Sequence, residues 1–270
     1  MPLYVFWGDR LLAAKLQTAN QDASAGAVAE AARIVAQIRA RWPEVEIWIR
    51  ADSGFAREAL MAWCEANGVD YVLGLARNAR LQRAIGAALY EAKQRCEATG
   101  EAVRSFGELD YRTKKTWSRA RRVVAKAEWL PGKANPRFVV TSLPADRVPA
   151  RELYETIYCA RGDMENRIKE QQLDLFADRT STATLRANQL RLWFASMAYA
   201  LVAQLRRIGL AGTALARAQA GTIRLRLFKI AALVQVTVRR IVISLSSVYP
   251  LQALFAQVLA NLQRFSTLRN

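Results

Sequence analysis

The sequence predicts an α/β protein with a β-strand insertion in its middle and a mainly helical C-terminal region. Three patterns indicate this. Strand-like segments alternate with helices of ten or more residues over the first hundred residues, which is typical of layered α/β folds. Three strand-like segments then follow one another between residues 101 and 143. From residue 149 onward, long helical patterns dominate again.

The first hundred residues begin with a predicted hairpin that turns at Gly8-Asp9. Pro43 and Gly68 each follow a predicted helix, as residues that end helices do. The predicted elements are strands over 3–7 and 11–16, a helix over 25–41, a buried strand over 45–51, a helix over 57–67, a strand over 71–75 and a helix over 79–98.

The remaining elements are strands in the insertion and long helices after it. They are strands over 103–113, 121–129 and 137–142, helices over 151–175 and 182–207, two short strands over 234–238 and 241–245, and a helix over 251–265. We therefore expect four parts, with boundaries at the changes of pattern: a core over 1–100, the insertion over 101–143, a core helix within 144–180, and a basic helical and β region over 181–270.

The positive charge is concentrated at the C-terminal end. Residues 179–270 contain thirteen Arg and Lys and no Asp or Glu, whereas residues 1–178 contain 27 basic and 23 acidic residues. Uncompensated positive charges repel one another, and a polyanion relieves that repulsion. DNA is therefore the predicted partner, and a merely solvated basic surface is the alternative. A membrane surface fits less well, because the basic residues do not gather on one amphipathic helix.

Residue types that are absent or scattered exclude several kinds of site. The chain has no histidine, which excludes Ser-His-Asp and Cys-His nucleophilic sites and His-ligated zinc. Cys64, Cys96 and Cys159 are widely spaced, which favours a reducing cytoplasm over a metal knuckle or redox pair. No apolar run reaches the roughly 18 residues that a membrane span needs. Carboxylates with hard metal ions remain as the candidate chemistry.

Asp52 is the first candidate site residue. It stands at the end of the predicted strand over 45–51, where α/β folds place reactive groups. The alternative is a capping role, because Asp-Ser-Gly is common in turns.

Tyr158, Arg161 and Glu165 form the second group of candidates. Their spacings of three and four place them on one face of a continuous helix, and Lys169 follows four residues after Glu165. A solvated helix face with a Glu–Lys pair is the alternative.

Taken together, these segments resemble insertion-sequence DDE transposases. RADSGF at 50–55 is similar to their second-Asp strand end, and Tyr158-x2-Arg161-x3-Glu165 is similar to their Tyr-Arg-Glu-Lys signature. The neighbouring sequences, ANGVDYVLGLARNARL and ARGDMENRIKEQQLDLF, extend the resemblance. It implies an RNase H-like mixed sheet with flanking helices and a β-strand insertion before the helix that carries the Glu.

The resemblance also implies a role for each candidate. Asp52 and Glu165 would be catalytic carboxylates that bind two Mg²⁺ or Mn²⁺ ions for phosphodiester cleavage and strand transfer at transposon ends. Tyr158 and Arg161 would contact DNA phosphate. The signature Lys falls seven residues after Glu165, where this chain has Gln172, so Lys169 is the candidate replacement.

A second departure concerns the first catalytic Asp, which the family carries on a core strand beside the strand of Asp52. The acidic residues before Asp52 do not fit that place; they are Asp9, Asp22, Glu30, Glu44 and Glu46. We expect the first strand and its Asp to be missing, which predicts a truncated transposase that binds DNA and is catalytically incomplete. The alternative is a non-catalytic DNA-binding regulator of transposition. The expected protein partner is a second copy or a full-length transposase.

Overall fold

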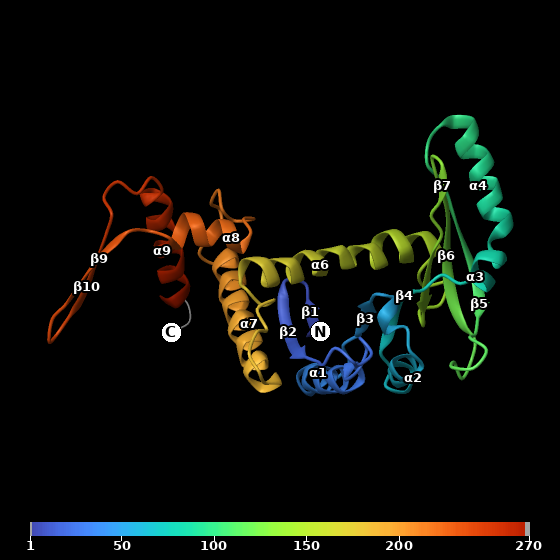
Figure 1. Cartoon of the computed structure of the whole chain (residues 1–270), viewed down its shortest axis with the longest axis horizontal. Coiled ribbons are helices and arrows are strands. Elements are labelled where there is room, and N and C mark those ends of the chain that lie inside the picture. Colours follow the sequence, from blue (N-terminus) through green and yellow to red (C-terminus); the bar gives the residue numbers. More distant parts are fainter. Residues whose placement is uncertain (1, 268–270) are drawn as a thin grey trace. The chain divides into compact units, whose positions relative to one another are not determined.

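A computed structural model describes residues 2–267 and divides the chain into two compact units (Figure 1). The first unit comprises Gln17–Asp163. The second comprises Pro2–Leu16 together with the chain from Met164 onward. Each unit has its own hydrophobic clusters and is described separately.

The first unit is built on a mixed sheet with the strand order β3-β4-β8-β6-β5, and β7 pairs with β6. Its strands are β3 (Trp48–Ala51), β4 (Asp70–Leu75), β5 (Val103–Tyr111), β6 (Arg121–Leu130), β7 (Lys133–Ala134) and β8 (Arg137–Thr141). β3 and β4 are parallel, whereas all the other pairs are antiparallel. The mixed α/β architecture that the sequence predicts is confirmed, and the strands of residues 101–143 extend this same sheet.

Successive side chains of β4 point to opposite faces of the sheet, and the two faces pack against different elements. Tyr71 and Leu73 enter the cluster formed with α1, α2 and the α3–α4 segment, while Val72 enters the cluster beneath the helical segment that follows residue 149. Gly74 has the same parity as Val72 and therefore faces that second side. In Figure 1, α4 runs alongside β5 and β6. The helices of the first unit that precede residue 149 are α1 (Ala27–Arg41), α2 (Glu58–Ala66), α3 (Ala79–Ala84) and α4 (Gly86–Thr99).

Two sequence expectations need correction in this unit. The strand predicted as buried over 45–51 is shorter, and of its side chains only Ala51 is buried, because β3 lies at the sheet edge and pairs with β4 alone among the described strands. The helix predicted over 79–98 is two helices, because the backbone of Ile85 leaves the helical region at φ −104° and ψ 14°. Gly86 follows at the break, and glycine weakens a helix interior by about 1 kcal/mol.

A long helical segment begins at α5 (Ala150–Glu152) and continues to Asp174. It is not a regular α-helix, because wider π turns and one tighter 3-10 turn interrupt it. The parts are π turns over Leu153–Tyr158 and Glu170–Asp174, a 3-10 turn over Cys159–Arg161, and α6 (Gly162–Lys169). The division between the two units falls within α6, after Asp163.

The second unit contains the hairpin of β1 (Pro2–Trp7) and β2 (Arg10–Leu16), which packs against α7 (Leu185–Arg207). Tyr199 at the centre of α7 is fully buried, and its hydroxyl donates to the Asp9 carbonyl at 2.9 Å. The other elements are α8 (Ala220–Ile223), β9 (Ala232–Val236), β10 (Ile241–Leu245) and α9 (Gln252–Thr267).

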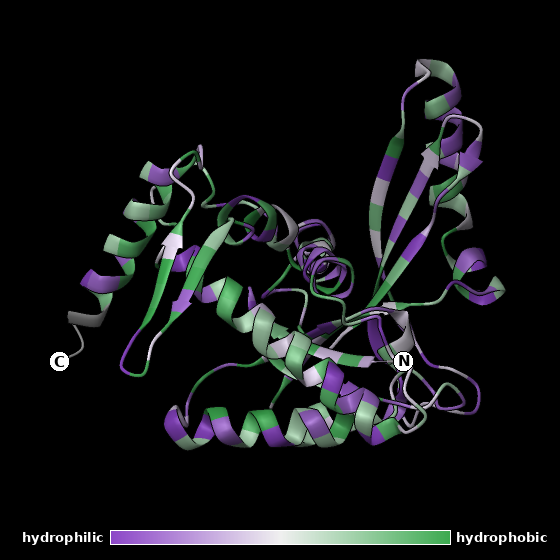
Figure 2. Ribbon diagram, turned by 60° about the vertical axis from the view of Figure 1, so that its left-hand side comes forward, coloured by the Kyte–Doolittle hydropathy of each residue, from purple (hydrophilic) through white to green (hydrophobic). Residues whose placement is uncertain are grey.

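The β9–β10 hairpin forms a two-stranded sheet of its own, and every residue of both strands is exposed. Hydrophobic stretches of its ribbon are visible in Figure 2. The tip is closed by hydrogen bonds between Thr237 and Arg240, with the Thr237 N–H donating to the Arg240 carbonyl at 2.8 Å.

Over the described residues, no helix combines the length and the apolar character that crossing a bilayer requires.

Candidate active site

A cavity of about 390 Å³ lies in the first unit, where β3 and β4 end and β8 begins. It brings together three of the residues that the sequence singled out, Asp52, Tyr158 and Arg161. The complete lining is Asp52, Ser53, Gly74, Leu75, Ala76, Arg77, Pro136, Arg137, Phe138, Tyr158 and Arg161.

Asp52 follows β3 directly and caps a 3-10 turn over Ser53–Phe55. Its Oδ1 accepts a hydrogen bond from the Gly54 N–H at 2.8 Å. The capping alternative is therefore correct, but it engages only this oxygen, and Oδ2 accepts no hydrogen bond from the described residues. Asp52 is exposed at the cavity and keeps one carboxylate oxygen available for a ligand.

Gly74 allows Tyr158 to reach the turn that carries Asp52. A β-carbon at Gly74 would lie 2.5 Å from the Tyr158 hydroxyl oxygen and 3.0 Å from the Ser53 backbone nitrogen. The same carbon would lie 3.2 Å from the Asp52 carbonyl carbon. Ordinary carbon contacts need more space than this, so only glycine lets the strand, the turn and the phenol meet.

Tyr158 is held in place by aromatic packing along its own helical segment. Its ring centroid lies 5.6 Å from that of Tyr154, which in turn lies 5.6 Å from that of Phe106 on β5. Burial raises the pKa of Tyr154 to about 12, and the nearby Cys159 and Tyr158 add to the effect. The Tyr154 phenol is thus a neutral packing group, whereas the Tyr158 hydroxyl reaches the cavity.

Arg161 lies one turn after Tyr158, and its guanidinium carbon sits 5.2 Å from the centre of the Tyr158 ring. Arg50 of β3 contacts the same segment, because its Nη1 donates to the Ile157 carbonyl at 2.5 Å. Burial lowers the pKa of Arg50, with Asp163 opposing this effect and Arg161 adding to it. Tyr158 and Arg161 therefore line one cavity although the helical segment that carries them is irregular.

Sequence reasoning missed two further cations of this cavity, Arg77 and Arg137. Both are exposed. Arg77 follows the end of β4 by two residues, and Arg137 opens β8, which pairs with β4 through Leu75 and Phe138. An antiparallel pairing places the start of one strand beside the end of the other, so the order of strands would have revealed Arg137. With Arg161, these side chains give the cavity three guanidinium groups and one carboxylate.

The turn that bears Asp52 is continuous with α2, and a buried ion-pair network fixes α2 to the sheet. The Arg121 side chain is 2% exposed and bonds Glu58 through Nη1 at 2.7 Å and Glu65 through Nε at 2.7 Å. The Tyr71 hydroxyl donates to Glu65 Oε1 at 2.7 Å. Hydrogen bonding to Arg121 lowers the pKa of Glu58 to about 2. Burial raises the pKa of Glu65, but the bonds from Arg121 and Tyr71 outweigh it and the net shift is downward.

Glu165, Lys169 and Gln172 belong to the second unit, whereas Asp52 belongs to the first. Glu165 and Lys169 are exposed on α6, and Gln172 is half-buried in the π turn that follows. The structure thus gathers Asp52, Tyr158 and Arg161 in one cavity, and it leaves the pairing of Asp52 with Glu165 as a prediction.

The donor atoms of this site suit a hard divalent cation in kind but are few in number. Mg²⁺ and Mn²⁺ prefer carboxylate oxygens, and Asp52 offers Oδ2. Within the described part of the chain, no group of three or more Asp, Glu, Cys or His side chains is arranged to hold a metal ion. The first unit therefore provides one carboxylate at this cavity, beside the guanidinium groups of Arg77, Arg137 and Arg161.

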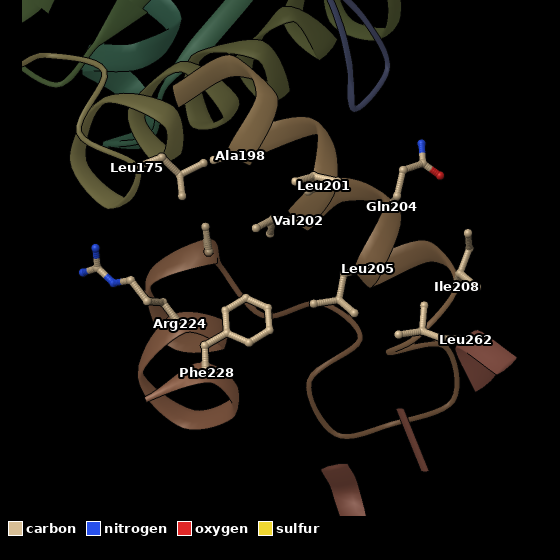
Figure 3. Close-up of a pocket in the computed structure, with 11 residues that line it drawn as sticks. Leu175, Ala198, Leu201, Val202, Gln204, Leu205, Ile208, Arg224, Phe228 and Leu262 are labelled. Carbon is tan, nitrogen blue, oxygen red and sulfur yellow. The ribbon is translucent and has the colours of Figure 1, made fainter. Parts of the chain in front are cut away.

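A larger cavity in the second unit has no such chemistry. Its volume is about 520 Å³, and α7 lines one wall with Leu201, Val202 and Leu205 (Figure 3). Phe228 lines the opposite wall, and the guanidinium of neighbouring Arg224 donates to the Asp174 carbonyl at 2.9 Å. Because its walls are almost entirely apolar, this cavity is not a candidate for phosphodiester chemistry.

Comparison with known proteins identifies the family of this chain. The family model described as Transposase DDE domain group 1 matches residues 1–267. A search of curated proteins finds no match. DDE transposases are polynucleotidyl transferases that work with divalent metal ions, and the Asp-bearing strand end with its basic rim is compatible with that chemistry. Because the match spans nearly the whole chain, this protein belongs to the DDE transposases of the insertion-sequence type.

Proposed function

We propose that the chain binds the phosphate backbone of transposon-end DNA at the cavity of Asp52, with Asp52 and Glu165 as its metal-binding carboxylates. The observation that carries the proposal is the joint lining of one cavity by a carboxylate with a free oxygen and three guanidinium groups. A phosphodiester needs both, because cations attract the phosphate while the carboxylate holds the metal ion that the reaction uses.

Each group has a distinct role in this proposal. Arg161, Arg77 and Arg137 attract and orient a phosphate, and the guanidinium fork suits two of its oxygens at once. The Tyr158 hydroxyl donates a hydrogen bond to the same phosphate. Asp52 Oδ2 would hold a divalent ion, and the two ions of a complete site would activate the attacking oxygen and stabilise the leaving oxygen. Lys169 takes the place of the signature Lys, because Gln172 carries no charge.

We further propose that this chain alone does not complete the reaction. Among the described residues, β3 has a neighbour on one side only, and no acidic cluster accompanies Asp52. A strand that pairs with the free edge of β3 would place its residues beside Asp52, which is where the family's first Asp lies. Binding without cleavage also fits a regulator of transposition, the second candidate function, which acts through DNA or through a full-length transposase.

A DNA-binding assay tests whether the cavity of Asp52 contacts the phosphate backbone. Arg161→Gln should weaken binding of a labelled short duplex about tenfold at about 0.1 M salt and lower the salt slope by about 1, equally for unrelated sequences. Arg151→Gln is the matched control, since Arg151 is exposed on the same helical segment and lies outside the cavity lining. Equal losses in both variants would remove the assignment of the cavity as the DNA site.

A DNA cleavage assay tests whether this chain alone carries a complete set of catalytic carboxylates. We expect no Mg²⁺- or Mn²⁺-dependent nicking of DNA by the chain alone. Nicking that disappears in Asp52→Ala would show that a full carboxylate set is present after all. Glu165→Ala separates the two candidate functions: DNA binding in the presence of Mg²⁺ should weaken in a transposase site, whereas a regulator should bind as before.

A further inference from the structure

A second basic cavity, of about 490 Å³, lies wholly within the second unit. Four of its lining residues are arginines, and they come from three different elements: Arg167 from α6, Arg206 and Arg207 from the last turn of α7, and Arg217 from the loop before α8. The other lining residues are Asp9, Asn166, Glu170, Ala216, Ala218 and Gln219. We call this cavity the arginine pocket.

One of these arginines is part of the wall. Arg206 Nη2 bonds Glu170 Oε1, and Arg206 Nε donates to the Ala218 carbonyl at 2.7 Å. The Ala220 N–H also donates to Glu170 Oε1, at 2.5 Å. The side chains of both ions are nearly buried, at 12% and 5% exposure. This pair ties the end of α7 to the loop that carries Arg217.

The other three arginines have unused donors. Arg167 Nε is buried and has no hydrogen-bond partner among the described residues. Arg207 donates to Gln204 Oε1 at 2.7 Å, and Arg217 makes no hydrogen bond or ion pair within the described part of the chain. A buried N–H without an acceptor is costly, and an acceptor atom inside the pocket removes that cost.

The positions of these residues do not follow from helix chemistry alone. Basic residues in the last turn of a helix interact favourably with its dipole, which accounts for Arg206 and Arg207. Arg167 and Arg217 lie on other elements, so the dipole of α7 does not explain why their side chains line the same pocket. Asp9 is the only carboxylate of the lining besides the paired Glu170. The pocket therefore keeps a net positive charge after its internal ion pair is counted.

We propose that the arginine pocket binds a phosphate group of the DNA backbone, as a contact separate from the cavity of Asp52. Guanidinium groups are the protein donors best suited to phosphate, and several from different directions can enclose one. The lining contains no aromatic side chain on which a base could stack. The pocket consequently positions the duplex without reading its sequence. This inference rests on the proposed function, since it assigns a second contact to the same DNA.

The test compares two double variants of the full chain that lose equal charge. Arg167→Gln/Arg217→Gln removes two donors of the pocket, whereas Arg186→Gln/Arg239→Gln removes two exposed arginines of the same unit outside it. Duplex binding is followed by fluorescence anisotropy over a range of salt concentrations. The pocket variant should lose about tenfold in affinity at about 0.1 M salt, with a salt slope smaller by about 1, on two unrelated sequences. The control should lose less than about twofold.

Two further variants separate a loss of phosphate contacts from misfolding and from a loss of net charge. Arg217→Gln alone should give part of the loss, and because this side chain makes no internal bond, misfolding would not explain the result. Arg167→Lys/Arg217→Lys keeps the charge without the fork and should recover only part of the affinity. Equal losses in the pocket and control variants would overturn the proposal, since net charge alone would then explain them.

A last arm separates nucleic-acid phosphate from a free anion. Tripolyphosphate should compete with the duplex for the wild-type chain and much less for the pocket variant. If tripolyphosphate raises the melting temperature of the wild type only, while both bind duplex equally, the pocket serves a free phosphate and the DNA assignment is wrong. If the pocket variant binds DNA as tightly as the wild type, the arginine pocket is not a DNA contact, but the proposed function stands. If the wild-type chain binds no DNA, both the pocket proposal and the proposed function are wrong.

Discussion

Replacing Arg121 by methionine should destabilise the first unit by about 3–5 kcal/mol at neutral pH. Arg121 makes four charge-assisted hydrogen bonds: to Glu65 Oε1 and Oε2 at 2.7 and 3.0 Å, and to Glu58 Oε2 and Oε1 at 2.7 and 3.2 Å. Methionine fills much of the volume but removes the buried cation that the two carboxylates share, and Glu65 is left with its exposed partner Arg119. Removing one partner of a buried ion pair costs about 3–5 kcal/mol, and the 27% exposure of the Glu58 side chain keeps the loss from being larger.

The loss should depend on pH in a defined direction. Glu58 has a pKa of about 2 in the folded chain, below its usual value of 4.5. A carboxylate with a lowered pKa stabilises the fold above its unfolded pKa, and this contribution disappears as the pH falls through its folded pKa. Wild-type stability should therefore decline between about pH 4.5 and 2, and Arg121→Met should show a flatter profile. Urea unfolding followed by tryptophan fluorescence at several pH values measures both quantities.

Arg119 provides the matched control. It pairs with the same Glu65 at 3.0 Å, but its side chain is 62% exposed. Arg119→Met should cost less than about 1 kcal/mol, because exposed ion pairs contribute little. The reasoning is refuted if the two variants lose similar stability, or if Arg121→Met retains the wild-type dependence on pH.

Two further predictions concern the site and the cysteines. Gly74→Ala should weaken DNA binding in the anisotropy assay as strongly as Tyr158→Ala, because the new methyl group displaces the phenol or the Asp52 turn; wild-type affinity in Gly74→Ala would contradict the close approach. Cys159 is exposed whereas Cys64 and Cys96 are buried, and burial raises the pKa of Cys64 to about 12. Iodoacetamide at pH 8 should therefore label Cys159 rapidly and the other two only after denaturation, and mass spectrometry of tryptic peptides would reveal early labelling of Cys64 if this is wrong.

The sequence predicted the element types well because hydrophobic periodicity reports local burial. Tyr71, Val72 and Leu73 form a short apolar run typical of a strand covered on both faces, and β4 is such a strand. The exposure of the Asp52 strand was not predictable in this way. Val45, Ile47, Trp48 and Ile49 are apolar, but the number of neighbours that a strand has depends on sheet order, which pattern alone does not give.

The candidate site was predictable only in part for the same reason. Asp52 was found as the end of a predicted strand, and Tyr158 and Arg161 were found through their helical spacing; all three line one cavity. Arg137 lies 85 residues after Asp52 in the chain and enters the cavity only because β8 pairs with β4. Gly74 carries no side chain for a motif search to notice. Its role is a space requirement, and this is visible only once Tyr158 is in place.

The exposed β9–β10 hairpin has a consequence for how the second unit can vary. An isolated two-stranded ribbon is marginally stable in water, so its amide protons should exchange with solvent first. None of its residues belongs to the hydrophobic clusters of the described chain. We therefore expect insertions, deletions or substitutions between Ala232 and Leu245 to change the folding of α7 and α9 little. This ribbon should therefore accept new sequence with little loss of stability.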